Sequence, residues 1–423
     1  MKEFDKIIGY ESIKNELVQL VDMIKNKPAY EKLGAKLPRG VLLHGDPGLG
    51  KTLMAKCFIK ASGLKSYVIR RNKGTTDFVN EITNIFHEAK QNAPSIIFLD
   101  DMDKFANEDD DHRDAEEYVA VQSGIDTLED AEVVIIATTN EIYKLPPSLC
   151  RSGRFDRKIE VKLPSEADHA AIIKYYLDSK PLSNDVNYDD ITKMIGYNSC
   201  AELESIMNEA AINAAYAKRD SISIADVVQA VLRMEYNSPD TYSKESEAHI
   251  REAALHEAGH LVVCEVLIPG SVGLASIRKA GRDNTGGFMR RCMDVVRRQE
   301  ILICLGGKAA TELYNSETCA SGCAQDLERA YKEIRIGITA SGTCGLSGIR
   351  LNEWGSASDV TNARIDTIIH AELEKYMFKS RDILIKNKDF LEKVAEALIE
   401  KETLLHSDIQ KIRSEVSIVE VAL

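Results

Sequence analysis

The sequence predicts two structural parts, a parallel α/β domain with a helical lid and a mostly α-helical domain that follows it. Three observations lead to this prediction. A glycine-rich sequence at residues 45–52 lies between an apolar run and a helical pattern, as in strand–loop–helix phosphate-binding sites. Two further apolar runs end in polar residues, as strands of a parallel sheet often do. The second half of the chain has helical periodicity and contains the motif HExxH at residues 256–260.

Apolar runs and helical spacing define the elements of the first part. An amphipathic helix is expected over residues 11–25 and a short buried strand over residues 40–44. Two more strands are expected over residues 95–101 and 133–140, since each is a continuous apolar run that suits the interior of a parallel sheet. The small helical lid should then contain helices over residues 170–178, 189–195, 201–218 and 224–236.

The glycine-rich loop fits the pattern GxxxxGK[ST] in the strand–loop–helix context that this motif requires. Its glycines allow backbone N–H groups to surround phosphate oxygens at the start of a helix. Lys51 should reach the β- and γ-phosphates of ATP, and Thr52 should bind Mg²⁺. The flanking strand and helix make a glycine turn without a ligand the less favoured interpretation. The residues of this segment expected to bind nucleotide are Asp46, Pro47, Gly48, Leu49, Gly50, Lys51, Thr52 and Leu53.

The next two strands end in polar residues that suit ATP hydrolysis. The first ends in the acids Asp100 and Asp101, of which the first would bind Mg²⁺ and the second would polarise the attacking water. Asn140 ends the second strand and should lie at the same edge of the sheet, where parallel sheets bind their ligands. Further along, Arg151 and Arg154 could contact phosphate in the same or a neighbouring subunit, or could form a solvated basic turn.

The second part begins with a helix that carries a metal-binding motif. His256 and His260 are four residues apart, so both imidazoles project from one face, as two ligands of a tetrahedral Zn²⁺ do. Glu257 can then reach a metal-bound water and take its proton. The apolar composition of this helix makes a chance pair of surface histidines less favoured, because buried imidazoles need partners. Pro269 and Gly270 should end the helix.

The remaining pattern sets the domain boundaries. After the first helix of the second part, a small sheet is expected over residues 271–291. Helices are expected over residues 294–314, 324–340, 357–377, 380–387 and 388–400. A polar, proline-containing segment predicts a linker between the two parts. The expected domains are a nucleotide-binding domain at 1–165, a helical lid at 166–236, a linker at 237–247 and a metallopeptidase domain at 248–423.

Composition places the chain among ordinary globular proteins and excludes some partners. The 423 residues include 67 acidic and 54 basic side chains, for a net charge of −13, which argues against non-specific binding to nucleic acid or anionic membranes. Nine scattered cysteines without a CxxC pair indicate a reducing compartment, so we expect a cytoplasmic protein. No apolar run is long enough for a transmembrane helix, and the start does not resemble a signal peptide.

In this order and spacing, the two motifs and their neighbours strongly resemble the FtsH-type AAA+ zinc proteases. The resemblance covers residues 3–415 and extends to the segment at 319–327. It implies an AAA+ module followed by a mostly helical metallopeptidase domain, assembled as a hexameric ring. It also implies the cofactors Zn²⁺, ATP and Mg²⁺, and ATP-driven movement of a polypeptide into an enclosed proteolytic chamber.

The resemblance also assigns roles to residues whose function the pattern alone leaves open. Ile8 and Gly9 correspond to the adenine side of the family's nucleotide site. Asn140 corresponds to the family's sensor residue. Arg151 and Arg154 correspond to arginine fingers, which implies that they act on the nucleotide of a neighbouring subunit.

The third zinc ligand must come from outside the HExxH helix, because a catalytic zinc usually has three protein ligands. Asp326 follows a turn and should lie in the first turn of the next helix, where a carboxylate is compatible with the helix dipole. From the residues alone, a role as a helix cap is about equally plausible. The family match over residues 320–327 implies that Asp326 is the ligand. Candidates that are less well placed or less suitable are His249, Glu252, Glu265, Asp283, Cys319 and Cys323.

The sequence departs from the family's pattern in three places. The usual N-terminal membrane anchor does not precede the AAA+ module here, so either the protein is soluble or its anchor lies outside this sequence. Asp101 stands where the family has Glu. The region matching the family's first pore loop, residues 72–76, has no aromatic residue, although Phe78 is nearby. The last departure affects how the chain would grip a substrate.

Two classes of function remain open after this comparison. We favour an ATP-dependent zinc endopeptidase that unfolds, translocates and degrades polypeptides as a homo-hexamer. The alternative is a ring-forming ATPase that remodels or holds protein partners with weak or no proteolysis. A third and weaker interpretation is an ATP-independent peptidase with a degenerate motor.

Replacing Asp101 with Glu tests the departure at the end of the acidic strand. The Asp101 carboxylate is one methylene shorter than the family's Glu and should hold the attacking water less well, because catalytic positioning is sensitive to about 1 Å. We expect slow ATP turnover in the parent chain and faster turnover in Asp101→Glu, measured as phosphate release. A parent rate that Asp101→Glu leaves unchanged or reduces would show that the backbone compensates for the shorter side chain.

Overall fold

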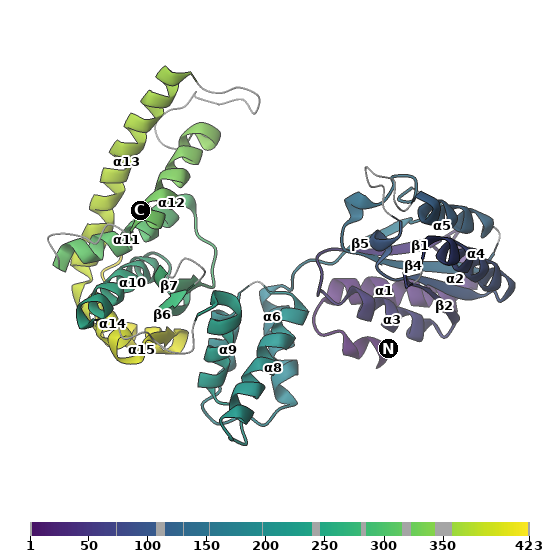
Figure 1. Cartoon of the computed structure of the whole chain (residues 1–423), viewed down its shortest axis with the longest axis horizontal. Coiled ribbons are helices and arrows are strands. Elements are labelled where there is room, and N and C mark those ends of the chain that lie inside the picture. The colour runs from purple at the N-terminus through teal and green to yellow at the C-terminus, as the bar shows by residue number, and fades with distance from the viewer. Residues whose placement is uncertain are drawn as a thin grey trace. The chain divides into compact units, whose positions relative to one another are not determined.

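We describe the fold from a computed structural model of the chain (Figure 1). The structure describes residues 2–72, 74–106, 115–129, 131–151, 153–196, 198–238, 246–280, 285–314, 323–342 and 358–421. Two compact units result: the first is Met1–Lys180 with Tyr197–Asn208, and the second is Pro181–Gly196 with Glu209–Leu423. The division falls inside the predicted lid, so the boundaries of the lid and linker remain predictions.

The first unit contains a five-stranded parallel sheet in the order β2-β3-β4-β1-β5. The strands are β1 (Gly40–His44), β2 (Lys65–Ile69), β3 (Ser95–Leu99), β4 (Val133–Thr139) and β5 (Arg157–Glu160). Strands β3 and β4 are buried along their whole length, because helices cover both faces of a parallel sheet. The three predicted strands are therefore confirmed, and they form the centre of the sheet.

Helices flank this sheet on both faces. They are α1 (Glu11–Lys25), α2 (Lys27–Glu31), α3 (Lys51–Ser62), α4 (Thr75–Gln91) and α5 (Ala115–Thr127), with short 3₁₀ helices at Lys2–Lys6, Met102–Lys104 and Ile142–Lys144. Helix α6 (Glu166–Asp178) belongs to the same unit but does not cover the sheet (Figure 1). Helices α4 and α5 pack on one face through a core that includes Phe78, Ile82 and Phe86, and α1 and α3 lie on the other face (Figure 1). The carboxyl ends of β1, β3 and β4 consequently meet at one edge.

The second unit is mostly helical and contains a small antiparallel sheet in the order β7-β6-β8. Its strands are β6 (Val272–Ala280), β7 (Thr285–Arg291) and β8 (Thr403–Leu405). Its helices are α7 (Tyr188–Met194), α9 (Ile224–Tyr236), α10 (Glu247–Leu267), α11 (Arg297–Tyr314), α12 (Ala324–Ile336), α13 (Asp359–Lys386), α14 (Lys388–Lys401) and α15 (His406–Ser414). Helix α8 (Cys200–Tyr216) contributes to both units.

Several predicted elements of the second unit need correction. The helices predicted over residues 357–377 and 380–387 are one continuous helix, α13. Nothing between them breaks a helix, and the polar Ser380 is buried because its hydroxyl donates a hydrogen bond to the Leu302 carbonyl at 2.7 Å. The helix predicted to end at residue 340 leaves α-helical geometry after Ile336 and continues as a π-helical turn over Gly337–Ser341.

Glu265 stabilises the C-terminal end of α10, the helix that carries the HExxH motif, through hydrogen bonds to the segments that surround it. Its side chain is fully buried, yet its carboxylate accepts hydrogen bonds from the backbone N–H groups of Gly270 and Val272, both at 2.9 Å. The Gln410 amide of α15 donates a third, at 3.1 Å, and Arg413 donates to the Glu265 carbonyl at 2.6 Å. A buried carboxylate with this many donors is satisfied without a metal ion. Glu265 therefore has a structural role.

In the part of the chain that the structure describes, no helix is both long enough and apolar enough to cross a bilayer.

Candidate active sites

The loop between β1 and α3 has the backbone geometry of a phosphate-binding loop. Gly48 and Gly50 have φ angles of +79° and +85°, which a residue with a β-carbon adopts only with strain. The Lys51 ammonium donates hydrogen bonds to the carbonyls of Gly45 and Asp46 at 2.7 and 2.6 Å. Burial lowers the pKa of Lys51. A phosphate group in this loop would give the lysine a negatively charged partner in place of two carbonyls.

Thr52 and Asp100 lie together at the carboxyl edge of the sheet, as the sequence predicts. The Thr52 hydroxyl donates to Asp100 Oδ1 at 2.9 Å, and the Thr138 hydroxyl donates to the same oxygen at 3.0 Å. Asp100 is nearly buried. Hydroxyl and carboxylate oxygens so placed are the ligands that Mg²⁺ takes at such sites, so these residues fit the ion that accompanies ATP.

Asp101 occupies a constrained position beside Asp100. Its backbone is left-handed, with a φ of +56°, and its N–H donates to the Thr138 hydroxyl at 2.9 Å. The Lys104 ammonium lies 2.6 Å from Asp101 Oδ2, and an Arg70 nitrogen lies 3.9 Å from the same atom. Lys104 and Arg70, which are not part of the motif, therefore lie beside Asp101, the acid that is expected to polarise water.

A cavity of about 880 Å³ adjoins this loop. The predicted residues that line it are Ile8, Pro47, Gly48, Leu49, Gly50, Lys51, Thr52, Leu53, Asp101 and Asn140. Sequence reasoning missed the opposite wall, to which α6 and α8 contribute Tyr176, Cys200 and Glu204. No local motif marks these residues, because only the fold brings the two helices to the loop. Gly9 lies one residue from the lining, with a φ of +70°.

The two candidate arginine fingers do not line this cavity. Arg154 is held within its own chain, where its guanidinium pairs with both oxygens of Asp126 at 3.0 and 2.9 Å and donates to the Ser148 carbonyl at 2.5 Å. Arg151 is exposed on the surface. Their role as arginine fingers for a neighbouring subunit therefore remains a prediction, and Arg154 would first have to leave Asp126.

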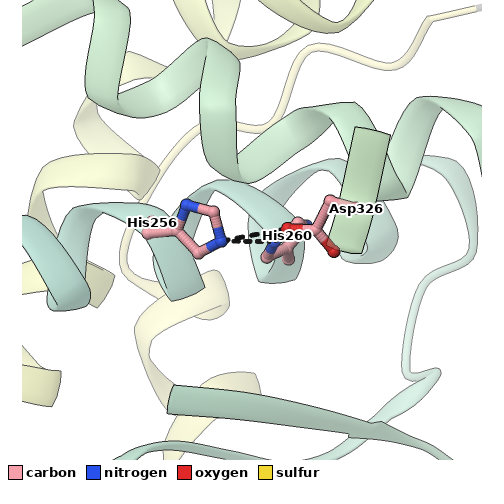
Figure 2. Close-up of side chains that lie close together, drawn as sticks. All are labelled: His256, His260 and Asp326. Atoms are coloured by element: carbon pink, nitrogen blue, oxygen red, sulfur yellow. Dashed lines mark hydrogen bonds and ion pairs between the residues drawn. The ribbon is translucent and has the colours of Figure 1, made fainter. Parts of the chain in front are cut away.

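The metal-binding residues come together in the second unit. His256 and His260 project from α10, and Asp326 projects toward them from the first turn of α12 (Figure 2). The two Nε2 atoms are 3.0 Å apart, and Asp326 Oδ2 lies 3.1 Å from each of them. Among the residues that the structure describes, this is the group of histidine, cysteine and acidic side chains whose spacing suits a metal ion.

The geometry of this triangle fits zinc. Tetrahedral zinc with bonds of about 2.0–2.1 Å holds its ligand atoms roughly 3.3 Å apart, close to the three spacings observed. The fourth position of such a site is available for water. Asp326 thus lies where a third ligand would be needed, and its helix is anchored by the buried Ala330 and Ile334. Its assignment as the third ligand remains a prediction.

The other ligand candidates are elsewhere or already engaged. His249 is exposed, and the metal-binding group of the described residues does not include Glu252. Cys323 is nearer, with its sulfur 4.0 Å from His256 Nδ1 rather than beside Nε2. Asp283 and Cys319 lie outside the described residues.

Glycines bring α11 against the two histidines. A β-carbon on Gly259 of α10 would lie 2.3 Å from the Gly306 carbonyl oxygen of α11, and one on Gly307 would lie 2.5 Å from His260 Nε2. The close approach also lets His260 Nδ1 donate to the Ile303 carbonyl at 2.6 Å. This bond fixes the ring so that Nε2 faces the metal position, a common arrangement for metal-binding histidines.

The protonation of the three ligands suits exchange of a proton for a metal ion. Burial lowers the pKa of His256. Burial acts in the same direction on His260, but hydrogen bonding to Asp326 outweighs it and raises the pKa of His260 to about 9. Burial would raise the pKa of Asp326, yet hydrogen bonds to both imidazoles hold it well below its usual range. Zinc binding should therefore release a proton from the histidine pair.

Glu257 is buried beside the metal-binding residues and packs against a glycine of β7. Burial raises the pKa of its carboxyl to about 8, although the charge of His260 opposes this. Gly287 has a φ of +85°, and a β-carbon there would lie 2.4 Å from Glu257 Oε1. Sequence reasoning missed Gly287; its signal was the glycine pair Gly286–Gly287 inside a strand.

Comparisons with known proteins agree with both sites. The chain matches the AAA family, described as ATPases associated with various cellular activities, over residues 41–163. It matches peptidase family M41 over residues 243–412.

Similar proteins extend this agreement to almost the whole chain. The ATP-dependent zinc metalloprotease FtsH of Leptotrichia buccalis is 32% identical, and the alignment covers 97% of this chain and 57% of that protein. FtsH 3 of Symbiobacterium thermophilum is also 32% identical, with 97% and 70% covered, and FtsH of Caldicellulosiruptor bescii is 31% identical, with 97% and 71% covered. The chain thus spans between 57% and 71% of the length of these relatives.

Replacing Gly287 with Ala should displace the Glu257 carboxylate without removing a metal ligand. The new β-carbon would overlap Oε1 and would also strain the backbone. We expect peptide cleavage to fall by about 10²-fold, since misplacement of a catalytic group by about 1 Å can cost that much, while bound zinc stays stoichiometric. Gly286→Ala is the matched control, because a β-carbon at Gly286 meets no atom within 4 Å. Equal cleavage by the two variants would contradict this account of Gly287.

Proposed function

Since the chain belongs to the FtsH family of ATP-dependent zinc metalloproteases, we propose that it is an ATP-dependent zinc endopeptidase acting on polypeptides. The observation that supports this most directly is the His256, His260 and Asp326 triangle with Glu257 beside it. The nucleotide site of the first unit supports dependence on ATP. A peptidase that did not use ATP would need only the first of these two sites, and an ATPase without peptidase activity would need only the second.

In peptide hydrolysis, His256, His260 and Asp326 would hold zinc and leave one position for water. Zinc supplies a Lewis acid that makes this water a nucleophile near neutral pH. Glu257 accepts the proton of the water and returns it to the leaving amine. Burial raises the pKa of the Glu257 carboxyl, and the positive charge of zinc beside it would favour the ionised form that the first transfer requires. The Ile303 carbonyl keeps His260 in the orientation that binding requires.

In ATP hydrolysis, Lys51 would contact the β- and γ-phosphates, and Thr52 and Asp100 would hold Mg²⁺. Asp101 and Asn140, which both line the cavity, would orient the attacking water. Ile8, on the cavity wall, would contact the adenine. The positions of Lys51, Thr52 and Asp100 around one loop support their roles, and the roles of Ile8 and Asn140 rest on the family resemblance.

We propose that the working assembly is a homo-hexameric ring that acts on polypeptides. A ring would bring Arg151 and Arg154 to a neighbour's nucleotide, where arginines stabilise charge on the transferred phosphate. Release of Arg154 from Asp126 would then accompany assembly. The described cysteines are free thiols, which supports a cytoplasmic location.

One observation supports the alternative of a ring that holds or remodels partners. Phe78, the aromatic residue near the predicted pore loop, is fully buried and packs edge-on against Phe105 at 5.3 Å. It is therefore not available to grip a polypeptide. A ring that pulls only weakly on folded substrates would be better suited to binding protein partners than to degrading them.

Replacing Glu257 with Gln should abolish peptide cleavage while zinc remains bound. Glu257 acts on the water and is not a ligand, so the amide removes the base and leaves the metal-binding triangle intact. We expect cleavage of casein to fall by about 10²–10⁴-fold, the usual contribution of a general base, with ATP hydrolysis unchanged. A chelator should have the same effect on the parent chain. Persistent cleavage by a zinc-loaded Glu257→Gln preparation free of other proteases would refute the zinc-peptidase assignment.

Replacing Lys51 with Ala should stop ATP turnover and with it the degradation of folded proteins. The ammonium that contacts the phosphates is lost, but the second unit is untouched, so short unstructured peptides should still be cut. Phosphate release and cleavage of a folded and an unfolded substrate measure the two activities separately. If Lys51→Ala hydrolysed ATP at the rate of the parent chain, the assignment of the nucleotide site would be wrong. Equal degradation of folded substrate with and without ATP would favour an ATP-independent peptidase.

A further inference from the structure

The last residue of α9 is in contact with the strand that supports Glu257. The Tyr236 ring stacks on the Phe288 ring of β7, with centroids 4.0 Å apart and an interplanar angle of 18°. The Tyr236 hydroxyl makes no hydrogen bond of good geometry in the described part of the chain, although it interacts electrostatically with Arg290 of the same strand. The face of the ring carries the stacking contact with Phe288.

A second contact joins α9 to the neighbouring strand β6. The Arg278 guanidinium donates to the Gln229 side chain of α9 at 3.1 Å and to Glu402 at 3.1 Å. The pairing of β6 with β7 is irregular here, because two residues of β6, including Arg278, lie opposite Gly287 alone. Such a bulge bends the strand that contains the extra residue, here β6, and increases the local twist of the pair. Helix α9 thus contacts both strands where their register shifts.

This irregular position lies against the catalytic base. Gly287 packs on the Glu257 carboxylate, and the next residue, Phe288, carries the stack with Tyr236. Glu257 of α10 and Tyr236 of α9 therefore contact two adjacent residues of β7, Gly287 and Phe288 respectively.

We propose that Tyr236 is a positioning residue for the peptidase, which holds Gly287 against Glu257 through its stack on Phe288. The proposal rests on the proposed peptidase function, because it assigns Glu257 as the base. Tyr236 ends a helix that the sequence assigns to the lid of the ATPase part. A residue of the lid segment thus acts on the base of the peptidase through one aromatic contact and one strand.

The test compares variants of Tyr236 in the full chain loaded with zinc. Tyr236→Phe keeps the stack, Tyr236→Leu keeps much of the buried volume without a flat ring, and Tyr236→Ala removes both. We expect Tyr236→Ala to lower kcat for a short unstructured peptide by about 10- to 10²-fold, the scale of a catalytic group displaced by up to 1 Å. KM, bound zinc and ATP hydrolysis should change less than twofold, and Tyr236→Phe should match the parent.

Hydrogen exchange of the β7 amides, residues 285–291, gives a readout that does not need proteolysis. Exchange should be faster in Tyr236→Ala and Tyr236→Leu than in the parent, and unchanged in Tyr236→Phe. Met234→Ala is the matched control, because Met234 lies on the same helix and is 45% exposed; it should alter neither kcat nor exchange. Phe288→Leu, which removes the other ring, should reproduce Tyr236→Leu.

Three outcomes would overturn the proposal. The first is parent-like kcat and parent-like β7 exchange in Tyr236→Ala. The second is an equal loss in Tyr236→Phe, which would assign the effect to the hydroxyl. The third is loss of zinc in proportion to activity, which would place the effect on the metal ligands. A parent chain that cleaves no peptide would count against the peptidase function instead, and exchange would still decide whether the stack orders β7.

Discussion

The close contact between α10 and α11 is the constraint on which the peptidase site depends. It exists because Gly259, Gly306 and Gly307 carry no β-carbons where the two helices meet. At this separation the Ile303 carbonyl reaches His260, and both histidine rings lie against bare backbone. Larger residues would move α11 away and remove the hydrogen bond that orients His260. The ligand geometry is thus a consequence of helix packing as much as of the motif.

Elements with strong local patterns could be predicted from the sequence, and elements fixed by distant contacts could not. The helix over residues 11–25 follows from its helical periodicity, and the three central strands follow from their continuous apolar runs. Strand β2 has one buried residue out of five and β5 one out of four, so neither has an apolar run to recognise. Strand β8 has three residues and pairs only with β6, which lies more than 120 positions earlier.

The candidate sites divide in the same way. Each motif predicts the side chains that it contains, and the structure places Lys51, Thr52 and Asp100 around one loop and His256 and His260 around one point. Asp326 could be named only with the help of the family match, because its partners are 66 and 70 residues away. Gly287 and Gly307 matter for the atoms they lack, which no pattern of functional side chains reveals. The need for glycine at these two positions is steric, and it can be recognised only when the neighbouring helix or strand is in place.

The buried carboxylate of Glu265 has a consequence for the order in which this chain can mature during synthesis. Helix α10 is translated before α15, yet two of the groups that bind Glu265 belong to Gln410 and Arg413 of α15, 145 and 148 residues further along the chain. Until those residues leave the ribosome, burial of Glu265 would leave hydrogen bonds unmade, at a cost of about 1–3 kcal/mol for an unsatisfied buried group. Helix α10 therefore reaches its final form only after α15 has been synthesised and has packed against it.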